Sequence, residues 1–502
     1  MDVTPILAEI VNEFRRENIR YIYLKKEEID DAEKNNYNSR RETTKVRIEE
    51  AMNILLQDNN RNTRIQSVIM NNKLSESLKE KLNCIQYLES KNYDEAEKLI
   101  NKMFANKPGS WKLNAQLMLI KEVTKDYNGA IKYFNNAIKD APAETSLRKK
   151  GAVLLRRYGK IDCAKNHYLR IIEKTAEDYE ALLLCGEMLS QTPNQKEAEA
   201  MLENYLIYAP KNNPQSGHLR AAVNLLIMSY TNADIQKCYY MLNMIRIMVG
   251  KGYTKSIMLE ANRTFVRAFS RLIKLYLESL NTNQFLKDKI ISGDESTLKR
   301  KERIVHIGDS HCLAFAHQEI KINNKALLIA PIIIKGAKAW HYCQVEDNEY
   351  KTALALHINQ MTSNKPLLIS FGEIDCRINE GILTYCRKYN QKIEKVTVAT
   401  AKGYIQWVWK LLTSKNLKPY FVGVPAPSKD YHNRYTKKDE MARLTLIRKF
   451  NETMQKQCKD LKVNYIDIYD VTAGSDGYNN EKYMIDEYHL SPIALHKLKL
   501  GG

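Results

Sequence analysis

The apolar and polar positions of the chain follow two different periods, and the change falls near residue 300. In the first part, apolar residues recur every three or four positions, as in 235–248 and 263–280, which is the spacing of amphipathic helices. In the second part, short runs rich in β-branched residues alternate with longer helical stretches. These runs are 303–307, 327–334, 367–371, 419–424 and 463–468. The pattern predicts a helical first part and an α/β second part.

The five C-terminal runs are almost continuously apolar, which is typical of strands buried on both faces of a parallel sheet. The segments between them are long enough for crossover helices. We therefore expect an α/β/α three-layer domain with a parallel five-stranded sheet over 303–502, after a polar linker at 291–302. In such sheets the functional groups gather beyond the carboxyl ends of the strands.

A repeat of 34 residues runs through the helical part. Small residues mark it at Ala96, Ala130, Ala164 and Ala198. Four positions after each alanine stands a bulky residue, and twelve positions after it stands a proline in three of the four units. The bulky residues are Ile100, Phe134, Tyr168 and Leu202, and the prolines are Pro108, Pro142 and Pro210. The spacing predicts antiparallel helix pairs in which small residues allow close approach.

This pattern resembles the tetratricopeptide repeat (TPR), which implies an all-α solenoid over 75–212 that binds a protein or peptide partner. The period continues without a clear register on both sides. We expect an N-terminal helical region at 1–74 and an irregular helical or capping region at 213–290.

Composition adds few constraints. A chain of 502 residues is longer than a single hydrophobic core usually supports, so at least two domains are expected. The net charge of +19 raises the question of nucleic acid, but Lys and Arg are spread without long basic clusters, and we expect no dedicated nucleic-acid site. No apolar stretch is long enough for a membrane span. Nine cysteines without a Cys-Xaa-Xaa-Cys pair, and a start without a basic leader, favour a cytoplasmic location.

Candidate chemistry lies at two points of the α/β part. The first strand leads into Gly308-Asp309-Ser310-His311, which places Ser310 at the carboxyl edge of the sheet. Near the end of the chain, Asp486 precedes His489 by three residues, so both side chains can face the same way. A serine, an imidazole and a carboxylate in this arrangement are typical of nucleophilic acyl transfer.

Three sequence blocks carry a family resemblance. GDS after the first strand, FGEIDCR after the third and DEYHL near the C-terminus resemble blocks of the SGNH/GDSL hydrolases and their acyltransferase relatives, whose sheet has the flavodoxin-like order. The match covers about 301–498, and GDSH with FGEIDCR is similar to a bacterial subgroup often found near surface-polysaccharide functions.

The resemblance implies a role for each residue of the site. Ser310 is then the nucleophile, His489 the general base and Asp486 the acid that orients it. The oxyanion hole takes the backbone N–H groups of Ser310 and Gly336. Asp309, Gly372, Glu373 and Asp375 belong to the supporting loops.

One position departs from the family pattern. The usual third oxyanion donor is an Asn, and Ile374 stands there. Ile374 has no side-chain donor. Either Arg377 supplies a cationic donor, with Glu373 and Asp375 orienting it, or the hole has two donors and the enzyme is slow or altered.

These observations predict a serine-dependent acyl-ester hydrolase or O-acyltransferase that acts on a small O-acyl group, such as acetyl, of a carbohydrate-like substrate. Phosphate-loop, dinucleotide and zinc-helix motifs are missing, so we expect no metal and no cofactor. The first alternative is a non-catalytic scaffold with a degenerate SGNH domain. A weaker one is polyanion binding through the excess positive charge.

Overall fold

The structure is a computed structural model. It describes residues 21–25, 43–47, 75–106, 110–210, 216–250, 267, 270–275, 302–322, 325–430 and 434–498. The chain forms two compact units, Met1–Leu155 and Arg156–Gly502. None of the helices in these ranges combines the length and the apolar character that crossing a membrane requires.

The described part of the first unit starts with an antiparallel strand pair. β1 (Tyr21–Lys25) pairs with β2 (Thr43–Arg47), with Tyr23 opposite Lys45. The prediction of a helical region at 1–74 is therefore wrong for these two segments, whose aromatic and β-branched residues favour strands. The rest of that prediction lies outside the described residues.

Helical hairpins follow the strand pair in the first unit. They are built from α5 (Glu76–Glu89), α6 (Tyr93–Asn106), α7 (Trp111–Val123), α8 (Tyr127–Asp140) and the start of α9 (Thr145–Arg157). Ala96 and Ala130 are fully buried, as the repeat predicts. A Cβ on Gly151 of α9 would lie 1.9 Å from the Phe134 ring of α8, so the two helices meet where there is no side chain. The predicted repeat array is confirmed.

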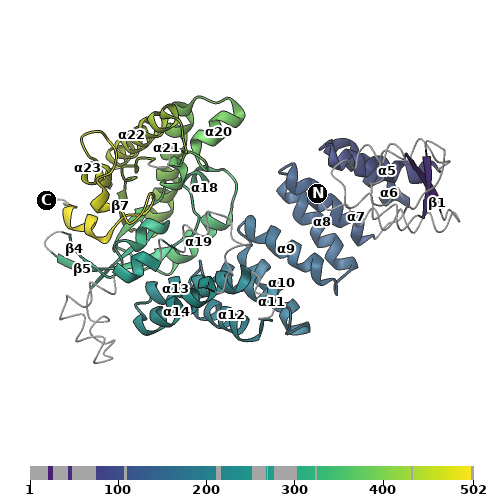
Figure 1. The fold of residues 1–502 in the computed structure, drawn as a ribbon, viewed down its shortest axis with the longest axis horizontal. Helices are drawn as coiled ribbons and strands as arrows, with labels where there is room; N and C mark the ends of the chain where they lie inside the picture. The colour runs from purple at the N-terminus through teal and green to yellow at the C-terminus, as the bar shows by residue number, and fades with distance from the viewer. Residues whose placement is uncertain are drawn as a thin grey trace. The chain divides into compact units, whose positions relative to one another are not determined.

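The second unit continues the hairpins. Its helices are α10 (Ile161–Lys174), α11 (Tyr179–Leu189), α12 (Gln195–Tyr208), α13 (Ser216–Thr231) and α14 (Ile235–Gly250). Ala164 and Ala198 are fully buried. Helices α13 and α14 form a further hairpin within the predicted capping region, and α13 contacts the α/β part (Figure 1). The division into units thus falls within α9, earlier in the chain than the composition change near residue 300.

The α/β part contains a six-stranded mixed sheet in the order β4-β5-β3-β6-β7-β8. Its strands are β3 (Arg303–Gly308), β4 (Glu319–Ile322), β5 (Lys325–Ile333), β6 (Pro366–Ser370), β7 (Lys418–Val422) and β8 (Asn464–Ile466). Five strands are parallel, and β4 is antiparallel to β5. The prediction of a purely parallel sheet is corrected by this edge hairpin, in which Ile320 and Ile322 alternate with exposed residues.

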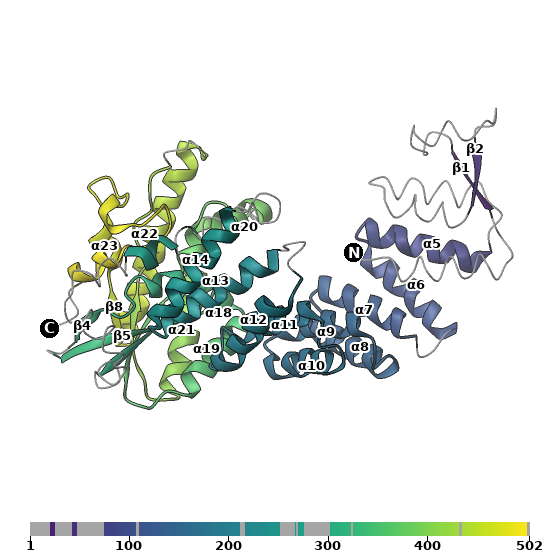
Figure 2. The ribbon, with the colours of Figure 1, turned by 60° about the horizontal axis from the view of Figure 1, so that its bottom comes forward.

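Two apolar cores lie on the two faces of the sheet. One is formed with α18 (Ala339–Cys343), α19 (Glu349–Asn359), α20 (Ile382–Tyr389), α21 (Ile393–Thr413) and α22 (Lys437–Asp460). The other is formed with Ala314 and Phe315, which follow the 3-10 turn η2 (Ser310–Leu313), and with α23 (Ile468–Thr472) and the turn η5 (Pro492–Lys497). Figure 2 shows α13 and α14 lying along the α/β part.

Candidate functional site

Ser310 lies where the order of the strands reverses. β3 pairs with β5 on one side and with β6 on the other, which makes its carboxyl end the switch point at which ligands bind in folds of this kind. A Cβ on Gly308 would lie 2.2 Å from Ser370 Oγ, which explains a glycine at the end of this strand. The backbone N–H of Ile334 donates to Gly308 O at 2.8 Å and brings the loop after β5 beside the Ser310 turn. Ser310 itself is partly exposed.

The two predicted oxyanion donors have free N–H groups. Within the described residues, neither the Ser310 N–H nor the Gly336 N–H donates to another group of the chain. Gly336 is exposed and has φ +76°, a left-handed conformation that favours glycine. The geometry is therefore compatible with two backbone donors that face a ligand.

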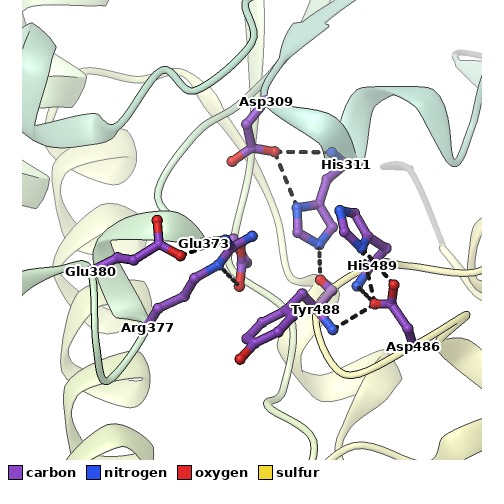
Figure 3. Close-up of polar contacts among 8 residues, drawn as sticks. All are labelled: Asp309, His311, Glu373, Arg377, Glu380, Asp486, Tyr488 and His489. Carbon is purple, nitrogen blue, oxygen red and sulfur yellow. Dashed lines mark hydrogen bonds and ion pairs between the residues drawn. The ribbon is translucent and has the colours of Figure 1, made fainter. Parts of the chain in front are cut away.

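Asp486 and His489 form a close pair (Figure 3). His489 Nδ1 lies 2.9 Å from both carboxylate oxygens, and the backbone N–H groups of Tyr488 and His489 each donate to Asp486 Oδ1 at 2.8 Å. Burial raises the pKa of Asp486, but the hydrogen bonds and the His489 ring lower it more, so the net shift is downward. A carboxylate on Nδ1 leaves Nε2 as the nitrogen that can accept a proton.

His311 joins the serine turn to this pair. Its Nδ1 donates to Asp309 Oδ1 at 3.1 Å, and its Nε2 donates to Tyr488 O at 2.8 Å. Burial lowers the pKa of His311, whereas the charge and hydrogen bond of Asp309 and the charge of Glu373 raise it, and the net shift is upward. The rings of His311 and His489 stack with their centroids 6.2 Å apart (Figure 3). From the sequence, His311 is expected to pack at the start of the turn more often than to shape the pocket, although its place directly after the serine was a usable signal.

The serine is not bonded to the base. Among the described residues, no hydrogen bond joins Ser310 Oγ to His489. The structure thus brings together Asp309, His311, Asp486 and His489, and it places Ser310 on the same turn as His311 without the last link.

Arg377 is held by two carboxylates. Its Nε and Nη2 bind Glu373, at 2.9 and 2.7 Å, and its Nη1 binds Glu380 at 3.1 Å. The guanidinium also lies 4.6 Å from the centroid of the Tyr488 ring. Burial raises the pKa of Glu373, but the charge and hydrogen bonds of Arg377, together with the charges of His311 and Arg443, lower it, and the net shift is downward. Glu373 thus binds Arg377, and all three Arg377 nitrogens are bonded to carboxylates instead of facing an open site.

Asp375 stabilises a helix. Its oxygens accept from the N–H groups of Ala339 at 2.7 Å and Trp340 at 3.0 Å, at the start of α18. Burial raises its pKa to about 7, against the effect of these two N–H groups. The predicted part of Asp375 in orienting Arg377 is thus replaced by a capping contact. In the same loop, Gly372 has φ +129°, and a Cβ there would lie 2.7 Å from Phe450.

A small cavity lies under the serine turn. His306, Asp309, His311, Ser370 and Glu373 contribute its polar lining, and its volume of about 10 Å³ suits one water molecule. His306 Nε2 lies 2.9 Å from Ser370 Oγ, and burial lowers the pKa of His306 to about 3. In the described part of the chain, no group of three or more His, Cys, Asp or Glu side chains is arranged to hold a metal ion.

Comparisons with known proteins concern the helical part. No protein-family model matches the chain, and no curated protein matches it in sequence. A tetratricopeptide repeat protein from Parabacteroides merdae is similar at 14% identity and a TM-score of 0.31, over 44% of this chain and 96% of that one. MamA from Desulfovibrio magneticus is 12% identical, with a TM-score of 0.31, over 36% and 98%. PilW, a type IV pilus biogenesis factor, is 15% identical, with a TM-score of 0.30, over 46% and 97%.

Proposed function

We propose that the chain is a serine-dependent acyl-ester hydrolase or O-acyltransferase of the SGNH type, with repeats that bind a protein partner. The observation that carries the proposal is the Asp486–His489 pair, which His311 ties to the turn of Ser310. The five parallel strands support it, because their order along the sheet is second, first, third, fourth and fifth, as in flavodoxin-like folds.

The proposed reaction moves one proton between Ser310 and His489, two groups that are not hydrogen-bonded to each other in the structure. His489 Nε2 takes the proton of Ser310 Oγ as the oxygen attacks the ester carbonyl carbon. The N–H groups of Ser310 and Gly336 stabilise the negative oxygen of the tetrahedral intermediate. When the carbonyl re-forms, the C–O bond to the alcohol breaks and the alcohol leaves with the proton from His489. Water, or a second hydroxyl, then attacks the acyl-serine by the same steps in reverse.

The substrate class follows from the family resemblance and from the open site. It is a small O-acyl group, such as acetyl, on a carbohydrate-like molecule. Ser310 is partly exposed and Gly336 is exposed, so a bulky alcohol part can remain outside while the acyl group enters.

The test is release of acetate from a panel of O-acetylated glycans, with and without added hydroxyl acceptors. Wild type should release acetate or transfer it, whereas Ser310→Ala and His489→Ala should lose at least about a hundredfold in rate. Ser414→Ala is the control, because Ser414 is exposed at the end of α21 and bonds only its own helix. Equal rates in wild type and Ser310→Ala would overturn the proposal.

A second candidate function is a scaffold in which the α/β part binds without catalysis. Three observations favour it: Ile374 is a buried apolar residue, Arg377 is bonded to carboxylates, and Ser310 makes no bond to His489. A scaffold would show no turnover on any ester and would bind its glycan equally well as wild type and as Ser310→Ala.

A further inference from the structure

Helix α13 is enclosed on nearly all sides. Residues 221–230 are all buried, polar ones included, whereas surface helices of globular proteins keep a polar face. The helix packs against α12 and α14 on one side and contacts β5 on the other. The repeat array and the α/β part therefore share a packed boundary at this helix.

The C-terminal end of α13 holds the serine turn. Tyr230 Oη donates to Leu313 O at 3.1 Å, and Leu313 is the last residue of the turn that begins at Ser310. His317 Nε2 donates back to Tyr230 O at 2.6 Å, and the two rings meet edge to face at 5.5 Å. Burial lowers the pKa of His317 to about 4, so the ring is a neutral donor to this carbonyl. The turn is thus fixed from outside by one tyrosine of the helical array.

A second contact reaches the loop of the candidate base. Arg271 Nη1 donates to Ile485 O at 2.6 Å. Ile485 precedes Asp486, and its N–H donates to His489 O at 2.8 Å, which closes the loop around the Asp486–His489 pair. The Arg271 guanidinium therefore binds Ile485, the residue whose own N–H closes this loop on His489.

Charged groups of the helical part also lie near the candidate oxyanion donor. Lys335, which precedes Gly336, is half-buried within electrostatic range of Glu187 on α11 and Arg220 on α13. Arg220 and Glu187 are themselves joined by an ion pair. Each of the three pieces of the candidate site thus has a polar neighbour in the helical array.

We propose that α13 and the helical segment 270–275, both in the region after the repeats, are a functional part of the active site. Tyr230 is a positioning residue for the turn of Ser310, and Arg271 is a positioning residue for the Asp486–His489 loop. This inference rests on the proposed acyl transfer. It means that the α/β part alone does not hold its catalytic groups in register, and that a ligand which moves α13 changes the rate at Ser310.

The test uses the full chain and two variants that leave the shape intact. Tyr230→Phe removes only the hydroxyl, and Arg271→Gln removes the charge, with Arg271→Lys as the conservative rescue. Tyr168→Phe is the matched control, because the Tyr168 hydroxyl on α10 is buried and makes no hydrogen bond in the described residues. Three readouts are compared: the maximal rate at which a fluorophosphonate labels Ser310, amide exchange in the peptide around 310–316, and the melting temperature.

Loss of one buried hydrogen bond should slow labelling about fivefold at saturating probe in Tyr230→Phe and leave the apparent probe affinity unchanged. Amide exchange at 310–316 should rise in the same variant and not in Tyr168→Phe. Arg271→Gln should slow labelling likewise, and Arg271→Lys should recover most of the rate. Equal slowing in Tyr168→Phe, or a drop in melting temperature without a change in maximal rate, would overturn the inference.

Failure of the two proposals can be told apart. If wild type is not labelled at Ser310, the acyl-transfer function fails, and amide exchange still reports whether Tyr230 fixes the turn. If wild type is labelled and both Tyr230→Phe and Arg271→Gln match it in rate and exchange, the function stands and the positioning role is refuted.

Discussion

The imidazole of His311 donates to the main-chain oxygen of Tyr488 at 2.8 Å, across 177 residues of sequence. This bond connects the turn that carries Ser310 to the loop that carries His489. Burial lowers the pKa of His311, but the Asp309 carboxylate, 3.1 Å from the other ring nitrogen, favours the charged ring. The two halves of the candidate site are therefore held together by a residue that takes no proton in the proposed reaction.

The His311 link can be tested by a double-mutant cycle. His311→Leu should lower the free energy of unfolding by about 3 kcal/mol, because Asp309 stays buried without its cation. Adding Asp309→Asn should recover part of that loss, although labelling of Ser310 should remain slow in both variants. Urea unfolding of the four proteins measures the coupling, and additive losses would contradict the assigned ion pair.

Asp486→Asn tests the orientation of the base. The amide still accepts one backbone N–H, but it no longer holds the Nδ1 proton of His489, so ester hydrolysis should fall roughly a hundredfold or more with little change in melting temperature. Asp476→Asn is a suitable control, because Asp476 is an exposed partner of Lys429. A rate within about twofold of wild type would argue against His489 as the base.

Arg377 offers a test of the oxyanion hole. Arg377→Met should destabilise the chain by about 3 kcal/mol, because it leaves the Glu373 carboxylate buried and unpaired, and Glu373→Gln in the same chain should restore much of this. Because the Arg377 guanidinium is ion-paired with Glu373 and Glu380, it is not expected to stabilise the oxyanion. The double variant should therefore hydrolyse esters at a rate of the same order as wild type. A loss of about a hundredfold or more in the double variant would instead assign Arg377 as the third donor.

The sequence predicted those features that depend on period and spacing. The 34-residue repeat located Ala96 and Ala130 in helix contacts, and the apolar runs located the five parallel strands. The sequence did not predict contacts between residues that lie far apart along the chain. The bond from His311 to Tyr488 and the bond from Tyr230 to Leu313 join residues 177 and 83 positions apart, so they depend on tertiary packing, which no local pattern encodes. β4 was missed because four residues give too short an alternation.

The buried histidines predict the direction of pH sensitivity. The pKa of His306 is about 3 in the folded chain and 6.5 in the unfolded one, so the unfolded state binds the proton first as pH falls. The contribution of His306 to the free energy of unfolding is fully present above pH 6.5 and decreases as the pH falls below that value. At about pH 5 the loss is about 2 kcal/mol. When the pH is lowered from about 7 to about 5, the melting temperature of His306→Gln should therefore fall less than that of wild type. A larger loss in the variant would refute a neutral buried His306.

The repeat contact at Gly151 can be tested by overpacking. Alanine is better than glycine in a helix by about 1 kcal/mol, yet a methyl group here would meet the Phe134 ring. Gly151→Ala should thus destabilise by about 1–3 kcal/mol, and Phe134→Leu in the same chain should relieve part of the cost. Thermal unfolding measures both; a stabilised Gly151→Ala would show that α8 and α9 do not meet at this point.

The central claim is that Ser310 is a nucleophile activated by His489. Intact-mass and peptide mass spectrometry after treatment with a fluorophosphonate measures this most directly. We expect one adduct per chain, on Ser310, that forms in wild type, forms far more slowly in His489→Ala and is absent in Ser310→Ala. An unlabelled wild type, or an adduct that persists in Ser310→Ala, would contradict the account.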